Sequence, residues 1–152
     1  MLAREYFEGI RAEVLAVARE QERLDRMRRD GLSITSPRCD CAGGGHGAGA
    51  SSPMDRVDAM IDAERRLRRR RSALKADISA ACEVLYGRSG RGGLARVMGT
   101  YYADVVCLVY TQGLDWPAAA AELQFSATWC RELSALAFAR MDEFGFATLK
   151  ET

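Results

Sequence analysis

The most informative part of the sequence is VVCLVYTQGLDWPAAAAELQFSATWCRELSALAFAR, which runs from Val105 to Arg140. Asp115, followed by an early proline, is a candidate N-cap and marks the start of a short helix. Ser126 is the next candidate N-cap, and a helical apolar pattern follows it. The stretch therefore predicts two helices, at 116–123 and at 126–144, joined by a very short turn.

The residues upstream of this stretch also have a helical pattern. Positions 94–112 read as one helix, and the glycine-rich segment 87–93 separates it from what precedes. No alternation typical of strands occurs anywhere in the chain, so residues 94–148 are expected to fold as a three-helix unit. The expected core residues of its first helix are Val97, Met98, Tyr101, Val105, Leu108 and Val109.

Two long helices are expected before this unit. Residues 2–30 carry apolar side chains at steps of three and four. Between Met1 and Gly31, the charges of seven arginines and seven acidic residues cancel. Residues 54–86 carry a second stripe of similar period. The segment 32–53 is rich in Gly, Ser and Ala, which is typical of a flexible linker. The predicted fold is therefore all-α, with a long antiparallel helical hairpin, a coiled coil, over residues 1–86.

Apolar residues that lie beside these stripes, such as Phe7, widen the apolar face of the hairpin beyond a single seam. A second copy of the chain, or the C-terminal unit folding back, must cover them, and a two-fold dimer is the simplest closed arrangement. The residues expected to carry this self-association are Val57, Ile61, Leu67, Leu74 and Ile78.

Six arginines surround Leu67 between positions 65 and 71. Their side chains could bind phosphates or an acidic partner. However, they point in all directions around the helix, so a partner that docks on one face of the helix cannot contact all of them. We expect instead a solvated surface that pairs with acids of the other long helix, such as Glu13, Glu20 and Glu22. Arg71 falls on the apolar stripe, where a polar residue can specify register or partner.

The segment 105–140 resembles the helix-turn-helix of sigma-factor region 4. The pattern is carried by Leu108, Tyr110, Gly113, Asp115, Trp116, Ala119, Ala120, Leu123, Phe125, Ser126 and Trp129. The alanines at 118–121 supply the small residues that two crossing helices need. Gln124 stands in the turn where glycine is usual, so it must accept an unusual backbone angle. Trp116 and Trp129 occupy the positions of the pattern that face the core.

The chain as a whole is similar to a group of small phage-encoded proteins. The families related to this group are the ArpU-like and RinA-like phage transcription regulators. The Pro53-Met54 pair, followed by Val57 and Ile61, matches their arrangement. The resemblance implies a phage or prophage DNA-binding transcription regulator in the cytoplasm of a bacterial host, with DNA and host RNA polymerase as partners. The residues expected at the DNA face are Ser126, Thr128, Arg131 and Ser134, with Arg140 on phosphate.

The charge of the C-terminal unit departs from that pattern. Members of the family tend to place basic residues just after the capping serine, where this chain has Ala127 and Thr128. Six basic and seven acidic residues lie between Gly87 and Thr152, which is a weak electrostatic footprint for DNA. The alternative is a structural or DNA-packaging component, similar to a small terminase subunit, or a protein-interaction module that does not read DNA sequence.

Composition excludes several other classes of protein. The chain has 152 residues with a formal net charge of +1, which argues against strong, indiscriminate attraction to nucleic acid or anionic membrane. No apolar run approaches the length needed to span a bilayer, so no membrane partner is expected. The five cysteines are scattered and odd in number, which favours reduced thiols in a cytoplasmic protein over a secreted disulfide framework.

No pattern for catalysis is present in the sequence. No nucleophile–base pair or carboxylate pair is recognisable, so we expect no enzyme, no cofactor and no small-molecule substrate. Cys39, Cys41 and His46 form the one candidate metal group, but a structural zinc site needs four ligands and the fourth is absent locally, so no metal is expected. The cysteines expected to be buried as small apolar residues are Cys82, Cys107 and Cys130.

Overall fold

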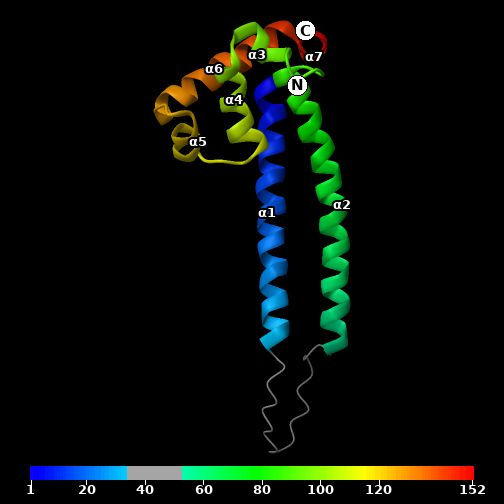
Figure 1. The fold of residues 1–152 in the computed structure, drawn as a ribbon. Coiled ribbons are helices and arrows are strands. Elements are labelled where there is room, and N and C mark those ends of the chain that lie inside the picture. The colour runs from blue at the N-terminus through cyan, green and yellow to red at the C-terminus, as the bar shows by residue number, and fades with distance from the viewer. Residues whose placement is uncertain (34–52) are drawn as a thin grey trace, which may run out of the picture. The chain divides into compact units, whose positions relative to one another are not determined.

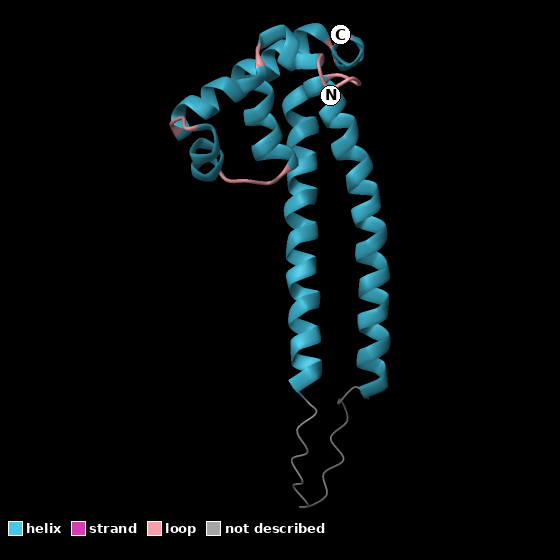
Figure 2. Ribbon diagram, in the orientation of Figure 1, coloured by secondary structure: helices cyan, strands magenta, loops and turns pink. Residues whose placement is uncertain are grey.

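The computed structural model describes residues 1–33 and 53–152, and every regular element in these ranges is a helix (Figures 1 and 2), which confirms the all-α prediction. None of these helices is both long and apolar enough to cross a membrane. The predicted linker 32–53 falls almost entirely outside the described residues. The elements are α1 (Ala3–Ser33), α2 (Pro53–Tyr86), α3 (Gly93–Met98), α4 (Thr100–Val106), the π-helical turn η1 (Cys107–Thr111), α5 (Trp116–Leu123), α6 (Ala127–Phe144) and α7 (Phe146–Glu151).

The chain forms two compact units, and the division runs through both long helices. The first unit comprises Met1–Ala16 and Ser72–Thr152, and the second unit comprises Val17–Arg71. From the sequence, the boundary between the two units was instead expected after residue 86. The difference arises because the first turns of α1 and the last turns of α2 pack with the C-terminal helices.

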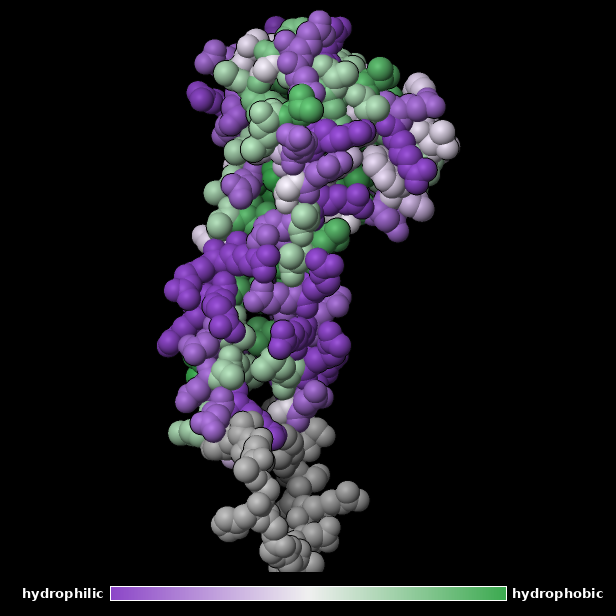
Figure 3. Space-filling model, turned by 180° about the vertical axis from the view of Figure 1, so that it is seen from behind, coloured by the Kyte–Doolittle hydropathy of each residue, from purple (hydrophilic) through white to green (hydrophobic). Residues whose placement is uncertain are grey.

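In the second unit, the segments of α1 and α2 run antiparallel. Arg28 of α1 forms an ion pair with Glu64 of α2, while Glu20, earlier in α1, accepts a bond of 3.1 Å from Arg70, later in α2. Leu24 and Leu67 are buried here, each only 3% exposed. The face of this unit seen in Figure 3 is mainly hydrophilic, as expected for a solvated arginine surface. The pair between Arg70 and Glu20 confirms one of the predicted contacts.

The five residues predicted to mediate self-association do not share one environment. Leu67 and Leu74 are buried within the chain, and Ile78 is half-buried, so these three already have partners. Val57 and Ile61 are exposed, at 46% and 38%. Arg71, predicted on the apolar stripe, is also exposed.

In the first unit, the N-terminal turns of α1 complete an aromatic core. Phe7 is fully buried, and its ring contacts Tyr110, Phe138 and Phe146, with centroid distances of 6.4, 5.8 and 6.4 Å. Tyr110 also meets Phe138 edge to face at 5.1 Å. Phe7 is thus covered by the C-terminal helices, which was one of the two arrangements the sequence left open. Leu2 and Leu15, which also lie beside the predicted stripe, are exposed.

The predicted single helix over 94–112 is wrong. Gly99, with a φ of +113°, separates α3 from α4, because a left-handed residue cannot continue a right-handed helix. The end of the segment widens into η1, where Thr111 donates its hydroxyl to the Cys107 carbonyl at 2.7 Å. Tyr101, predicted in the core, is 57% exposed and lies with its ring 5.2 Å from that of Phe125.

The predicted caps of α5 and α6 are confirmed. Asp115 accepts a bond of 2.9 Å from the backbone N–H of Ala118, and Ser126 accepts one of 3.1 Å from Trp129. Gln124 has the expected left-handed conformation, with φ of 58° and ψ of 37°. Helix α6 ends at Phe144 as predicted, but α7 follows it and extends the C-terminal unit beyond residue 148.

Candidate functional site

The pair α5–α6 is held on α4 by a small buried cluster. Val105, Ala120, Cys130 and Leu133 form it, and Trp116 packs against it. Ala120 is a member of the alanine run, and its small side chain permits the close approach of α5 and α6. The arrangement fixes which face of α6 is turned to solvent.

The predicted DNA-binding residues at the start of α6 are exposed. Thr128 and Arg131 both face solvent, one turn apart on the helix. Ser126 is exposed too, but its hydroxyl oxygen is engaged as the N-cap. Arg140 forms an ion pair with Glu143 at 2.6 Å, and its guanidinium lies 5.3 Å from the centre of the Phe144 ring. Glu143 therefore offsets part of the positive charge that Arg140 would present to a phosphate.

Two predictions about α6 are wrong. Ser134 is only 2% exposed, so it does not lie on the outer face of the helix with Thr128 and Arg131. Trp129, expected in the core, is 44% exposed. Both differences have one cause: α6 packs through Cys130, Leu133, Ser134 and Ala137, and this register turns Trp129 outward.

The two units differ in charge. By sequence, the first unit contains nine basic and twelve acidic residues, a formal net charge of −3. The second unit contains thirteen basic and nine acidic residues, a net charge of +4. The unit that carries α6 is therefore acidic overall, so any attraction between it and a polyanion must come from a local group of basic side chains.

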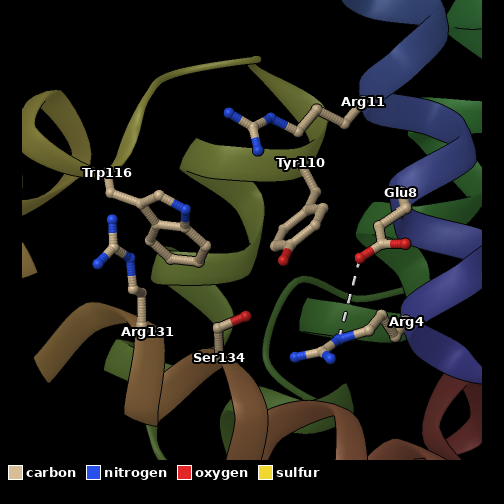
Figure 4. A pocket seen from close by; sticks show the side chains of 7 residues that line it. All are labelled: Arg4, Glu8, Arg11, Tyr110, Trp116, Arg131 and Ser134. Carbon is tan, nitrogen blue, oxygen red and sulfur yellow. Dashed lines mark ion pairs between the residues drawn. The ribbon is translucent and has the colours of Figure 1, made fainter. Parts of the chain in front are cut away.

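Such a group lines a pocket in the first unit (Figure 4). The pocket has a volume of about 350 Å³, and its walls come from α1, η1, α5 and α6. We call it the arginine pocket, and the residues that line it are Arg4, Glu8, Arg11, Tyr110, Trp116, Arg131 and Ser134. Arg131, predicted from the sequence to contact DNA, is thus brought together with two arginines of α1 that the sequence did not single out.

Helical spacing explains how this pocket is assembled. Arg4, Glu8 and Arg11 follow one another at steps of four and three, so they share one face of α1. Arg131 and Ser134 are three residues apart on α6. In Figure 4 the side chains of α1 lie across the pocket from those of α6, and Tyr110 lies between them.

The polar groups of the arginine pocket are only partly satisfied. Arg4 and Glu8 approach at 4.0 Å, and Arg11 donates a long bond of 3.4 Å to the carbonyl of Leu114. Within the described part of the chain, no hydrogen-bond partner is found for the buried Nε of Arg11 or for the buried hydroxyl of Ser134. Buried polar atoms without partners are rare in proteins and call for an explanation.

A second polar cluster lies between α2, α4 and η1. Tyr86 donates its hydroxyl to Asp104 Oδ1 at 2.7 Å, and burial, with this bond, raises the pKa of Tyr86 far above its ordinary value. Burial and the neighbouring thiol of Cys107 raise the pKa of Cys82. Burial also raises the pKa of Cys130, which is fully buried as predicted, whereas Cys82 and Cys107 are half-buried. A raised thiol pKa makes Cys82 and Cys130 poor nucleophiles.

The candidate metal ligands Cys39, Cys41 and His46 lie outside the described residues. Among residues 1–33 and 53–152, no group of three His, Cys, Asp or Glu side chains is arranged to hold a metal ion. In the first unit, the arginine pocket gathers four charged side chains around a cavity.

The sequence contained a partial signal for the arginine pocket. The spacing of Arg4, Glu8 and Arg11 places three charges on one face of α1, but that face reads as an ordinary solvated surface. Nothing in the spacing indicates that α6, more than a hundred residues away, will lie opposite.

No protein-family model, curated protein or solved structure matches the chain.

Proposed function

We propose that this protein is a DNA-binding transcription regulator of phage or prophage type, which acts through α5 and α6 in the bacterial cytoplasm. The observation that carries the proposal is the turn between these helices. The turn begins at Gln124, which adopts the left-handed conformation that a tight helix-turn-helix requires, and ends at Ser126, which caps α6, while Asp115 caps the start of α5.

In this proposal α6 enters the major groove by its N-terminal half. Thr128 and Arg131 are exposed there and carry the donors that read base edges, Arg above all at guanine. The helix N-terminus points toward backbone phosphates, which its dipole favours. Host RNA polymerase is the second proposed partner, by analogy with the sigma-type pattern that the segment resembles.

Enrichment of duplexes from a random-sequence pool tests DNA binding directly, because no site has to be assumed. The enriched duplex is then titrated by fluorescence anisotropy against wild type, Arg131→Ala and Arg88→Ala. Arg88 is an exposed arginine of the loop before α3, so Arg88→Ala removes the same charge as Arg131→Ala but at a site outside α6. We expect Arg131→Ala to lose about 1–3 kcal/mol of binding free energy, and Arg88→Ala to lose less. No enrichment at low salt, or equal losses in both variants, contradicts the proposal.

A protein-interaction or packaging component is the second candidate, and the exposed face of α6 favours it. Trp129 and Leu136 are 44% and 50% exposed and lie two turns apart on α6. Exposed aromatic and aliphatic side chains on one helix face are typical of protein interfaces. The acidic net charge of the first unit fits this function better than it fits DNA binding.

Trp129→Ala combined with Leu136→Ala separates the two functions. A packaging or interaction module loses its assembly in this variant, whereas Arg131→Ala leaves that assembly intact. Native mass spectrometry reports the stoichiometry: a dimer favours the regulator and a larger ring favours the packaging component. The reverse pattern, in which only Arg131→Ala has an effect and the protein is a dimer, excludes the second candidate.

We also propose that the second unit mediates dimerisation. Met54, Val57 and Ile61 are 71%, 46% and 38% exposed on successive turns of α2, which leaves apolar surface for a second copy. Because Val57 and Ile61 are exposed, their joint replacement by glutamate is expected to give a folded monomer. Leu2→Glu, at a 58% exposed site, is the matched control. A wild-type monomer at micromolar concentration by light scattering contradicts dimerisation.

A further inference from the structure

No small-molecule ligand was expected from the sequence, but the arginine pocket has the chemistry of a binding site. We propose that it binds a small organic anion, in which a carboxylate or phosphate group is attached to a planar ring. The proposal does not depend on DNA binding, since it rests on the pocket alone.

Charge is the first argument for an anion. Three guanidinium groups, those of Arg4, Arg11 and Arg131, line the pocket, and Glu8 is the single carboxylate among the lining residues. Glu8 approaches Arg4 at only 4.0 Å, so it offsets one of the three cations at most in part. Arginine presents its donors in a planar fork that matches carboxylate and phosphate oxygens, and it does so with little loss of conformational freedom.

The unpartnered buried atoms are the second, independent argument. Ser134 is 2% exposed, lines the pocket, and has no hydrogen-bond partner for its hydroxyl among the described residues. The Nε of Arg11 is buried and unpartnered in the same way. The two atoms come from α6 and α1. A hydrogen-bond acceptor that reaches either atom removes the cost of leaving it unsatisfied.

Volume and wall chemistry set the class of ligand. A pocket of about 350 Å³ falls in the range of small-molecule sites and is roughly ten times the ~30 Å³ share of one water, so a bare inorganic anion does not fill it. Trp116 and Tyr110 meet edge to face at 6.2 Å and form an aromatic wall. Arg131 already lies 5.8 Å from the centre of the Trp116 ring, and Arg11 lies 5.9 Å from that of Tyr110. The acid therefore meets the guanidinium groups while a ring packs on the aromatic wall.

The experiment uses Trp116 as an internal reporter. The chain has two tryptophans, and Trp129→Phe leaves Trp116 as the only one in an otherwise complete protein. Benzoate, phenyl phosphate, benzamide and inorganic phosphate are titrated separately while Trp116 fluorescence is followed. Benzamide has the shape of benzoate without its charge, and inorganic phosphate has the charge without a ring. We expect saturable binding of benzoate or phenyl phosphate, at least ~10-fold tighter than either control, and weakening with added salt.

Substitutions locate the binding. Arg131→Gln and Ser134→Ala are made in the Trp129→Phe protein, and Arg140→Gln, elsewhere on α6 and outside the pocket, is the matched control. We expect Arg131→Gln to weaken anion binding by ~10-fold or more and Ser134→Ala to weaken it several-fold, while Arg140→Gln binds as its parent does. Circular dichroism and the melting temperature verify that each variant is folded.

The outcomes that overturn the proposal are equally specific. Equal binding of benzoate and benzamide shows that the guanidinium groups do not select charge. Binding of inorganic phosphate as tight as that of phenyl phosphate rejects the aromatic part of the ligand. Absence of saturation by any probe up to 10 mM in a folded protein, or an equal loss in Arg131→Gln and Arg140→Gln, rejects the site itself. None of these results bears on enrichment of duplex DNA, so the two proposals fail separately.

Discussion

The backbone N–H of Ala3 donates a hydrogen bond of 2.6 Å to Asp142 Oδ1, across 139 positions of sequence. Ala3 begins α1, where the first N–H groups of a helix have no partner within the helix. A carboxylate of α6 thus supplies a cap that the local sequence does not provide, and its charge also suits the positive end of the helix dipole. This bond ties the start of the chain to the C-terminal helices of the first unit.

Removal of this cap is expected to destabilise the first unit moderately. Asp142→Ala should lower the free energy of unfolding by about 0.5–2 kcal/mol, as loss of a helix N-cap does. Glu143→Ala is the matched control, because Glu143 is the next residue and its carboxylate bonds to Arg140 on the exposed surface. Urea unfolding followed by circular dichroism measures both. Equal stability of Asp142→Ala and wild type would show that the bond contributes nothing.

The aromatic core predicts a larger effect at Phe7. This side chain is fully buried among the rings of Tyr6, Tyr110, Phe138 and Phe146, so Phe7→Ala leaves a cavity. We expect a loss of about 3–5 kcal/mol, measured by denaturant unfolding. Leu2→Ala, at a 58% exposed position near the same helix end, should change stability by less than ~0.5 kcal/mol. A loss below 1 kcal/mol at Phe7 would mean that α1 does not pack on the C-terminal helices.

Two glycines should respond to alanine in opposite directions. Gly93 has a φ of +64°, and an added Cβ would lie 2.6 Å from the Val84 carbonyl oxygen, so Gly93→Ala should cost more than ~2 kcal/mol. Gly9 lies inside α1, and an added Cβ there meets nothing within 4 Å. Gly9→Ala should therefore raise stability by about 0.5–1 kcal/mol. Thermal unfolding measures the melting temperature of each variant. A shift of the melting temperature in the same direction in both variants would contradict this prediction.

The bond from Tyr86 to Asp104 predicts a dependence of stability on alkaline pH. The pKa of Tyr86 is raised above its ordinary value of 10.0, first by burial and then by this bond. A group with a raised folded-state pKa contributes fully below its unfolded pKa, and the contribution is lost as pH rises toward the folded value. Wild type should therefore lose stability above about pH 10.

Tyr86→Phe isolates this effect from that of the other tyrosines. At neutral pH the variant should be less stable by about 1 kcal/mol, because the hydrogen bond to Asp104 is lost. Above about pH 10 the difference between the variant and wild type should shrink. Guanidinium unfolding at pH 7, 9, 10 and 11 measures the difference. A difference that stays constant over this range is incompatible with a raised Tyr86 pKa.

Local chemistry allowed much of the C-terminal unit to be predicted. Asp115 and Ser126 cap the helices they were expected to cap, because an N-cap depends only on a side chain and the two or three residues that follow it. The left-handed turn at Gln124 was likewise predicted from the few residues between two helix signals. The break at Gly99 was missed, because a single glycine inside a helical pattern is often tolerated.

The environment of each side chain was harder to predict than the helix that carries it. Trp129 and Tyr101 are large and apolar, which favoured the core, yet both are exposed. Ser134 is small and polar, which favoured the surface, yet it is buried beside the arginine pocket. Which face of a helix is buried depends on the neighbours it meets, and a shift of one position along the sequence turns that face by about 100°.

From the sequence alone one could predict that the described chain is helical, where most of its helices begin and end, and that its net charge is near zero. These properties follow from propensity, capping and composition, which act over a few residues. Three contacts arise only when the chain is folded: Asp142 caps α1, Phe7 completes an aromatic core, and Arg4 and Arg11 face Arg131. Each of these contacts joins α1 to helices that lie more than ninety residues further along the chain, so no local pattern encodes it, and packing alone brings the groups together.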